Sequence, residues 1–253
     1  MTKHKQSFWE WNNIILINSL KKINLNIILI IILDLLFYIS SGYLIILWLQ
    51  RIQAKLALFN LPSDVASLGY EKAQQVLAET KSFYYLLIFS FVLLIIAVIF
   101  LASILKGIIW AKTTDTKVSF ALISKFLGLN IIWMGFWLLL MLLIAYFIQI
   151  QLVSIFMTAA MILGIYFTNT LYTIFMKGQK FEAILAAIKL NITKIHLFLV
   201  PYIILFLLLF IIRSLFKLLQ FEYLAVIAGI IVVIYAAVAR YYTSNLVLEI
   251  EKI

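Results

Sequence analysis

The chain has 253 residues, of which 66% are apolar and 12% are charged, and its formal net charge is +10. A soluble domain carries about 25% charged residues, so this composition excludes an ordinary water-soluble protein. The basic residues alternate with long apolar segments instead of clustering on one soluble face, so we expect no nucleic-acid partner.

The first apolar segment covers about residues 24–49 and follows a basic stretch. It is too long for the apolar core of a cleavable signal peptide, and we expect it to remain as a membrane span. A hydrophilic insertion of about residues 51–82 comes next. Within it, Ser63 or Asp64 after Pro62 is typical of a helix N-cap. The charges of the insertion nearly cancel, and we assign no site to it.

Four further segments complete the membrane pattern. Residues 83–105, 195–212 and 223–239 each match the length of one span. Residues 126–176 contain no Asp, Glu, Lys, Arg or His. As one helix this segment would be roughly 75 Å long, against a hydrocarbon core of roughly 30 Å, so it must form two spans.

The sequence therefore predicts an all-α fold, a polytopic integral membrane bundle of six transmembrane helices. Helices are expected because each span in lipid must satisfy its own backbone hydrogen bonds, and the alternating pattern of a membrane β-barrel is absent. The lipid bilayer is the expected partner, and the cell membrane is the expected location.

The distribution of Lys and Arg predicts that both termini are cytoplasmic. With the N-terminus inside, fourteen of the twenty basic residues fall in cytoplasmic segments. These are Lys3, Lys5, Lys21, Lys22, Lys106, Lys112, Lys117, Lys125, Lys177, Lys180, Lys189, Lys194, Arg240 and Lys252.

A three-fold pattern runs through the cytoplasmic segments. Each contains a basic, partly apolar stretch that leads into Leu-Asn-Ile, at Leu25, Leu129 and Leu190. Such a stretch can form a short helix with lysines on one side and apolar side chains on the other, as suits the lipid headgroup region. We therefore expect three interfacial amphipathic helices, each followed by two spans. The repeats would cover about residues 7–112, 113–176 and 177–245 of a single membrane domain, 1–253.

These three stretches, the hairpin spans and the closing ARYYTSNLVLE at residues 239–249 carry a resemblance. The chain resembles uncharacterised prokaryotic six-helix membrane proteins related to the membrane domain that precedes some glycerophosphodiester phosphodiesterases. The resemblance implies a six-helix membrane fold over the whole chain. It implies no phosphodiesterase activity, because the soluble barrel with its acidic metal ligands has no counterpart here.

Two polar faces mark a candidate intramembrane polar site. Asp34 lies about ten residues into the first span and shares a helical face with Tyr38 and Ser41. On the fourth span a second face lies at a similar depth, and we expect it to be a partner of the first. Its residues are Tyr166, Asn169, Thr170 and Thr173.

Asp34 has two interpretations. It could change protonation or bind a cation while a solute passes, because acids inside membranes are functional hypotheses by default. It could instead hold helices together, and we favour this structural role because no second charge is expected at its depth. Arg213 and Arg240 are expected to reach a membrane interface with their long side chains instead of pairing with Asp34.

No motif for catalysis, nucleotide binding or metal binding occurs, since the chain lacks HExxH, GxxxxGK and GxGxxG. We expect no enzyme, no cofactor and no metal site. The first hypothesis is a non-enzymatic organising or accessory role with a membrane-protein partner, and the oligomeric state stays open. The alternative is a small proton- or cation-linked secondary transporter. An intramembrane lipid enzyme ranks last because the cytoplasmic acids are scattered.

Overall fold

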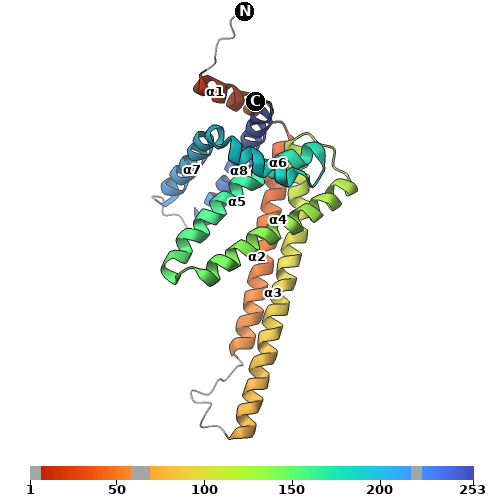
Figure 1. The fold of residues 1–253 in the computed structure, drawn as a ribbon, viewed down its shortest axis with the longest axis vertical. Coiled ribbons are helices and arrows are strands. Elements are labelled where there is room, and N and C mark those ends of the chain that lie inside the picture. The colour runs from red at the N-terminus through yellow and green to blue at the C-terminus, as the bar shows by residue number, and fades with distance from the viewer. Residues whose placement is uncertain (1–6, 58–68, 218–223) are drawn as a thin grey trace, which may run out of the picture. The chain divides into compact units, whose positions relative to one another are not determined.

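The computed structural model describes residues 7–57, 69–217 and 224–253, and these residues form helices and no strand (Figure 1). The all-helical prediction is therefore confirmed. In chain order the helices of this part of the chain are α1 (Phe8–Lys21), α2 (Asn26–Ala57), α3 (Tyr70–Thr113), α4 (Phe120–Phe147), α5 (Ile150–Gly178), α6 (Ala183–Thr193), α7 (Ile195–Lys217) and α8 (Leu224–Ile250).

Six of these helices, all except α1 and α6, are long and apolar enough to cross a membrane. This confirms the six predicted spans, and the protein is a multi-pass membrane protein. The shortest of the six, α7, has 23 residues, or roughly 35 Å at helical rise, which exceeds a hydrocarbon core of roughly 30 Å. The predicted start of the last span at Tyr223 lies outside the described residues.

A separate short helix is present at two of the three places where an interfacial helix was predicted. At the N-terminal end of α1, the Ser7 hydroxyl and the Glu10 carboxylate each accept a backbone N–H of the other residue, which forms a capping box. α6 is likewise a separate helix of 11 residues. The middle stretch instead forms the first turns of α4, which is capped by Ser119. Residues 120–132 contain no Pro and only one charge, so nothing ends that helix before its apolar part.

The hydrophilic insertion is not a helix of its own where the structure describes it. α2 continues to Ala57, and α3 begins at Tyr70 and runs without a break to Thr113. Residues 70–82 therefore form the first turns of a membrane-spanning helix. The cap predicted at Ser63 or Asp64 lies outside the described residues.

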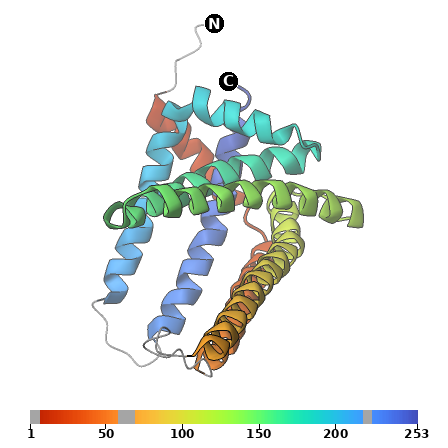
Figure 2. The same ribbon diagram turned by 60° about the horizontal axis from the view of Figure 1, so that its bottom comes forward.

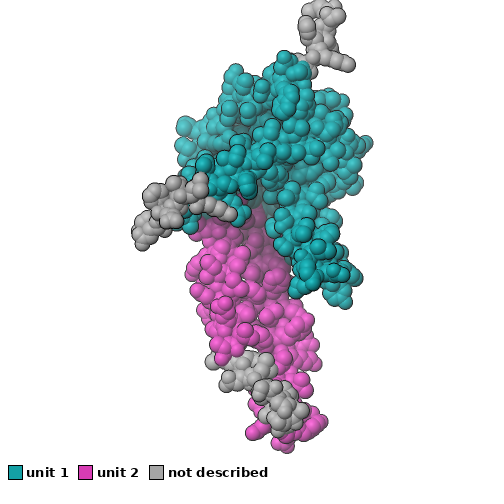
Figure 3. All heavy atoms as spheres, turned by 90° about the vertical axis from the view of Figure 1, so that its left-hand side faces the viewer, with its two compact units in different colours: residues 1–35, 103–253 teal, residues 36–102 magenta. Residues whose placement is uncertain are grey.

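The contacts divide the chain into two compact units (Figure 3). The first, which we call the core unit, contains residues 1–35 and 103–253. The second, the hairpin unit, contains residues 36–102 and so comprises most of α2 and α3. Within the hairpin unit, Trp48 Nε1 donates to Ser90 Oγ at 3.0 Å and the Trp48 ring packs against Phe91. These contacts join its two helices.

In the core unit, α5 and α8 make the most extensive helix contacts. α5 packs against α4, α6 and α8, and α8 also packs against α1 and α7. Figures 1 and 2 both show α1 beside the C-terminal end of α8. The first and the last described helices therefore meet at the same end of this unit.

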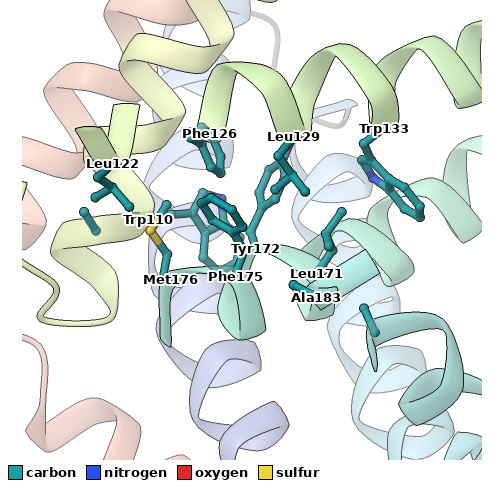
Figure 4. Packing of buried hydrophobic residues seen from close by; sticks show 12 residues of the cluster. Trp110, Leu122, Phe126, Leu129, Trp133, Leu171, Tyr172, Phe175, Met176 and Ala183 are labelled. Atoms are coloured by element: carbon teal, nitrogen blue, oxygen red, sulfur yellow. The ribbon is translucent and has the colours of Figure 1, made fainter. Parts of the chain in front are cut away.

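An aromatic cluster of buried side chains joins α3, α4, α5 and α6 (Figure 4). The ring of Tyr172 lies 4.8 Å from the ring of Phe126 and 5.6 Å from that of Trp110, between centroids. Such tilted and edge-to-face pairs stabilise packing where lipid removes the hydrophobic drive for helix association. On the outside of α4, by contrast, Leu139 and Leu142 are more than half exposed, as lipid-facing side chains are.

Candidate functional site: a buried ion triad

Asp34 of α2 lies between two cations from two other helices. Lys106 Nζ on α3 is 2.5 Å from Asp34 Oδ1. Arg240 on α8 donates from Nη1 to Asp34 Oδ2 at 2.9 Å and from Nη2 to Oδ1 at 3.3 Å. The Asp34 side chain is 1% exposed, and those of Lys106 and Arg240 are 16% and 10% exposed. We call these three residues the ion triad, and all of it lies in the core unit.

The ion triad forms because its members lie at similar distances from one end of their helices. Asp34 comes eight residues after the start of α2, Lys106 seven before the end of α3, and Arg240 ten before the end of α8. At helical rise these positions are about 12, 11 and 15 Å along their helices. Because α2 runs opposite to α3 and α8, the three charges can meet at one depth.

The charges in the triad stabilise one another where lipid would not. An unpaired charge at the bilayer centre costs at least about 2.5 kcal/mol. Here both oxygens of the carboxylate accept charge-assisted hydrogen bonds, and the Arg240 fork binds it bidentately. The Arg240 guanidinium also lies 5.7 Å from the centre of the Trp110 ring, within the range of a cation–π contact. The formal charge of the three residues is +1.

Two expectations about Asp34 were wrong. Arg240 pairs with Asp34 instead of reaching an interface, and two opposite charges are present at the depth of Asp34. The predicted spans ended just before the first cation, at residues 105 and 239, whereas α3 and α8 continue through Lys106 and Arg240. The signal that could have found the triad is that Lys106 and Arg240 each directly follow an apolar segment predicted to end at the same side of the membrane at which the span of Asp34 begins.

The second predicted face, on α5, binds α6 and α7. The Tyr166 hydroxyl donates to the backbone carbonyl of Asn191 at 2.9 Å, and Thr170 Oγ1 donates to Asn191 Oδ1 at 2.8 Å. Asn169 Nδ2 donates to the Tyr202 hydroxyl at 3.3 Å. Thr173 donates to the Asn169 carbonyl of its own helix. This face is therefore a set of links between helices.

The hydrogen bonds of Asp34 and those of Asn169 lead to different helices. Those of Asp34 lead to α3 and α8, and those of Asn169 lead to α7. In the hairpin unit, Ser41 Oγ donates to the Phe37 carbonyl of its own helix, and the Tyr38 side chain is half exposed. The hydrogen bonds of Asp34 therefore do not lead to the α5 face that was its expected partner.

Two asparagines of the Leu-Asn-Ile triplets are fully buried and hold helices together. Asn130 on α4 donates from Nδ2 to Ser103 Oγ at 3.0 Å, and its Oδ1 accepts from the Tyr172 hydroxyl. Asn191 on α6 accepts from Thr170 through its Oδ1. The third, Asn26, is half-buried near the start of α2, where its backbone N–H donates to Asn24. The triplet therefore places an amide between helices at two of its three occurrences.

Comparisons of the chain with models of protein families, with curated proteins and with solved structures give no match. The resemblance to six-helix membrane proteins therefore stays a prediction. Within the described ranges, no group of three or more His, Asp or Glu is placed to hold a metal ion. The ion triad is the most distinctive chemical feature of the described residues.

Removing only the acid of the triad should destabilise the protein. Asp34→Asn leaves two cations close together, and breaking a buried ion pair costs about 3–5 kcal/mol. At about 2–4 °C per kcal/mol, we expect thermal unfolding in detergent to begin roughly 10 °C lower. Replacing all three residues together, Asp34→Leu with Lys106→Met and Arg240→Met, should recover most of the loss.

The matched control is Arg213→Gln on α7, because Arg213 is exposed. This variant should unfold like the wild type. An Asp34→Asn protein that unfolds at the wild-type temperature would show that the triad does not hold the helices together.

The three asparagines of the Leu-Asn-Ile triplets should contribute differently to the stability of the protein. Asn130→Leu and Asn191→Leu each remove hydrogen bonds between buried helices, which are worth about 0.6–1.7 kcal/mol in membrane proteins. Asn26→Leu should change stability by less, because the Asn26 side chain is only half-buried. Unfolding of the three variants in increasing concentrations of a denaturing detergent measures the loss of stability of each one. An equal loss at all three positions would contradict the prediction.

Proposed function

We propose that this multi-pass membrane protein organises or assists other membrane proteins and catalyses no reaction itself. The observation that supports this most is the length of α3. It has 44 residues, or roughly 66 Å, about twice the hydrocarbon thickness of roughly 30 Å. A helix of that length extends well beyond the lipid.

The projecting part of α3 has the composition of a surface that meets water. Residues 70–82 include both acids and lysines and would extend roughly 20 Å from the apolar part of the helix. Tyr70 and Leu77, seven residues apart, share one helical face and are 78% and 64% exposed. An apolar face on a projecting helix is suited to contact with another protein.

The geometry of the ion triad supports a fixed structural role for Asp34. Its two carboxylate oxygens are both engaged by cations from other helices. A carboxylate that carries protons during transport has to release such partners in each cycle. Permanent ion pairs between three helices do not need to be released, and they suit a protein with a structural role.

We further propose that the protein lies in the cell membrane with both ends in the cytoplasm. The support is the excess of Lys and Arg in the segments on that side. In this orientation the projecting residues 70–82 are outside the cell.

Single cysteines can test this orientation because the natural chain has none. In intact cells, a maleimide reagent that does not cross membranes should label the Glu79→Cys protein, because Glu79 is exposed on the side of the helix opposite Leu77. It should label the Glu251→Cys protein only after the cells are permeabilised. The wild-type chain is the blank, and the opposite labelling pattern would reverse the topology.

A secondary transporter is the second candidate. It is favoured by charges inside the membrane, which mark transport pathways by default, and by Pro201 inside α7, where a broken backbone hydrogen bond permits bending. The test is the flux of protons and of a panel of solutes into liposomes under a pH gradient. The wild type is compared with Asp34→Asn/Arg240→Gln, which keeps the formal charge of the triad at +1.

The organising role predicts a partner at the projecting face. With a photoreactive phenylalanine analogue at position 77, illumination of native membranes should give one discrete protein adduct. The same analogue at position 142, on the exposed face of α4, should react with lipid instead. We expect this pattern together with no flux above empty liposomes.

A flux that the double variant loses, with no adduct at position 77, would replace the organising role by transport. The unfolding temperature of the double variant shows whether a lost flux reflects lost folding.

A further inference from the structure

A pocket of about 490 Å³ lies between α1 and the C-terminal end of α8, within the core unit. Its lining brings together an indole, a cation and an acid, from Trp11, Lys22 and Glu249. Asn18, Asn245 and Ile14 also line it. The pocket belongs neither to the ion triad nor to the projecting face of α3.

The cation of the pocket is held in place by α8. Lys22 Nζ donates to Asn245 Oδ1 at 2.7 Å, and Asn245 Nδ2 donates in turn to Ser19 Oγ at 3.0 Å. A lysine ammonium has three N–H donors, so this bond leaves donors for an oxyanion in the pocket. The exposed amide of Asn18 lies one helical turn before Lys22 and adds a further donor.

The acid of the pocket lies one turn farther along α8. Glu249 follows Asn245 by four residues, or roughly 6 Å at helical rise, and its Oε1 accepts from Lys252 at the surface. The Trp11 indole, from α1, offers an aromatic face of the kind that binds ammonium groups. The charges of Lys22 and Glu249 cancel, so the lining suits a ligand with one negative and one positive group.

We expect the pocket to lie at the level of the lipid headgroups. α8 has 27 residues, roughly 40 Å, so one end must extend beyond the hydrocarbon core of roughly 30 Å. α1 beside that end exposes large apolar side chains, among them Trp9 and Ile17 at 61% and 50%. A short helix with such a face is suited to lie along the membrane interface. In that position, phospholipid headgroups would be the most abundant molecules around the pocket.

We propose that this pocket binds the headgroup of a phosphoethanolamine lipid. The phosphate contacts Lys22 and Asn18, the primary ammonium contacts Glu249 and Trp11, and the acyl chains leave along the apolar side that includes Ile14. The ethanolamine unit bridges the one-turn offset between cation and acid. A choline headgroup lacks N–H donors for Glu249, and a glycerol headgroup lacks the cation, so both bind more weakly.

The test is a titration of purified, delipidated full-length protein in detergent, read by native mass spectrometry. The probes are phosphatidylethanolamine, phosphatidylcholine, phosphatidylglycerol, soluble phosphoethanolamine and inorganic phosphate. The wild type should prefer the ethanolamine lipid by about tenfold, the effect of one charge-assisted hydrogen bond. Glu249→Gln should abolish this preference, while Lys22→Gln should weaken binding of all three lipids.

Three of the pocket residues, Trp11, Lys22 and Glu249, each have a matched neighbour that does not line the pocket. Lys21→Gln, Glu251→Gln and Trp9→Leu are the controls for Lys22→Gln, Glu249→Gln and Trp11→Leu. The controls should bind like the wild type. Because Lys22 also bonds Asn245, its variant is compared by thermal unfolding, and Glu249→Gln tests the proposal independently.

Equal binding of the three lipids by the wild type would overturn the proposal, as would pocket variants that bind like their controls. Binding of phosphoethanolamine or inorganic phosphate as tight as that of the lipid would overturn it too, in favour of a soluble phosphate compound. A preference for the ethanolamine lipid that only Glu249→Gln abolishes, and not Glu251→Gln, would establish it.

Discussion

A single carboxylate within the bilayer sets the arrangement of the core unit. Asp34 is stable at its depth because Lys106 and Arg240 come to the same depth from α3 and α8. That requirement fixes how far each helix slides along its neighbours. α8 in turn packs against α1, α5 and α7. The position of one charged group therefore influences the arrangement of most helices of the core unit.

Apolar packing alone would leave such a bundle poorly specified, because lipid tails are as apolar as the helices. Polar links are therefore placed where a shift by one residue would break them. Asn130 bonds α3 and α5 at once, and Asn191 bonds α5 from α6. The aromatic rings around Tyr172 then fill the space between these links. The hydrogen bonds determine how the helices align along one another, and van der Waals contacts between side chains supply most of the packing.

The number of spans could be predicted because lipid imposes a length and a composition on each one, and six helices among the described residues satisfy both. The ends of the helices could not be predicted, because the prediction ended each of two spans at the residue before a cation. α3 and α8 continue through Lys106 and Arg240 because both cations pair with the carboxylate of Asp34. The helical period predicted that Tyr166, Asn169 and Thr170 share one face, and their side chains bond residues of α6 and α7. Their partners on α6 and α7 depend on tertiary packing, which periodicity within one helix does not encode.

The ion triad has a consequence for the order in which the protein is made. Asp34 and Lys106 are 72 residues apart, and Asp34 and Arg240 are 206 apart. At about 5–20 residues per second, the ribosome supplies the lysine roughly 4–14 s after the acid and the arginine roughly 10–40 s after it. During synthesis α2 thus carries an acid that gains its partners in two steps. The lysine of α3 is the earlier partner, and the triad is complete only when α8 has been made.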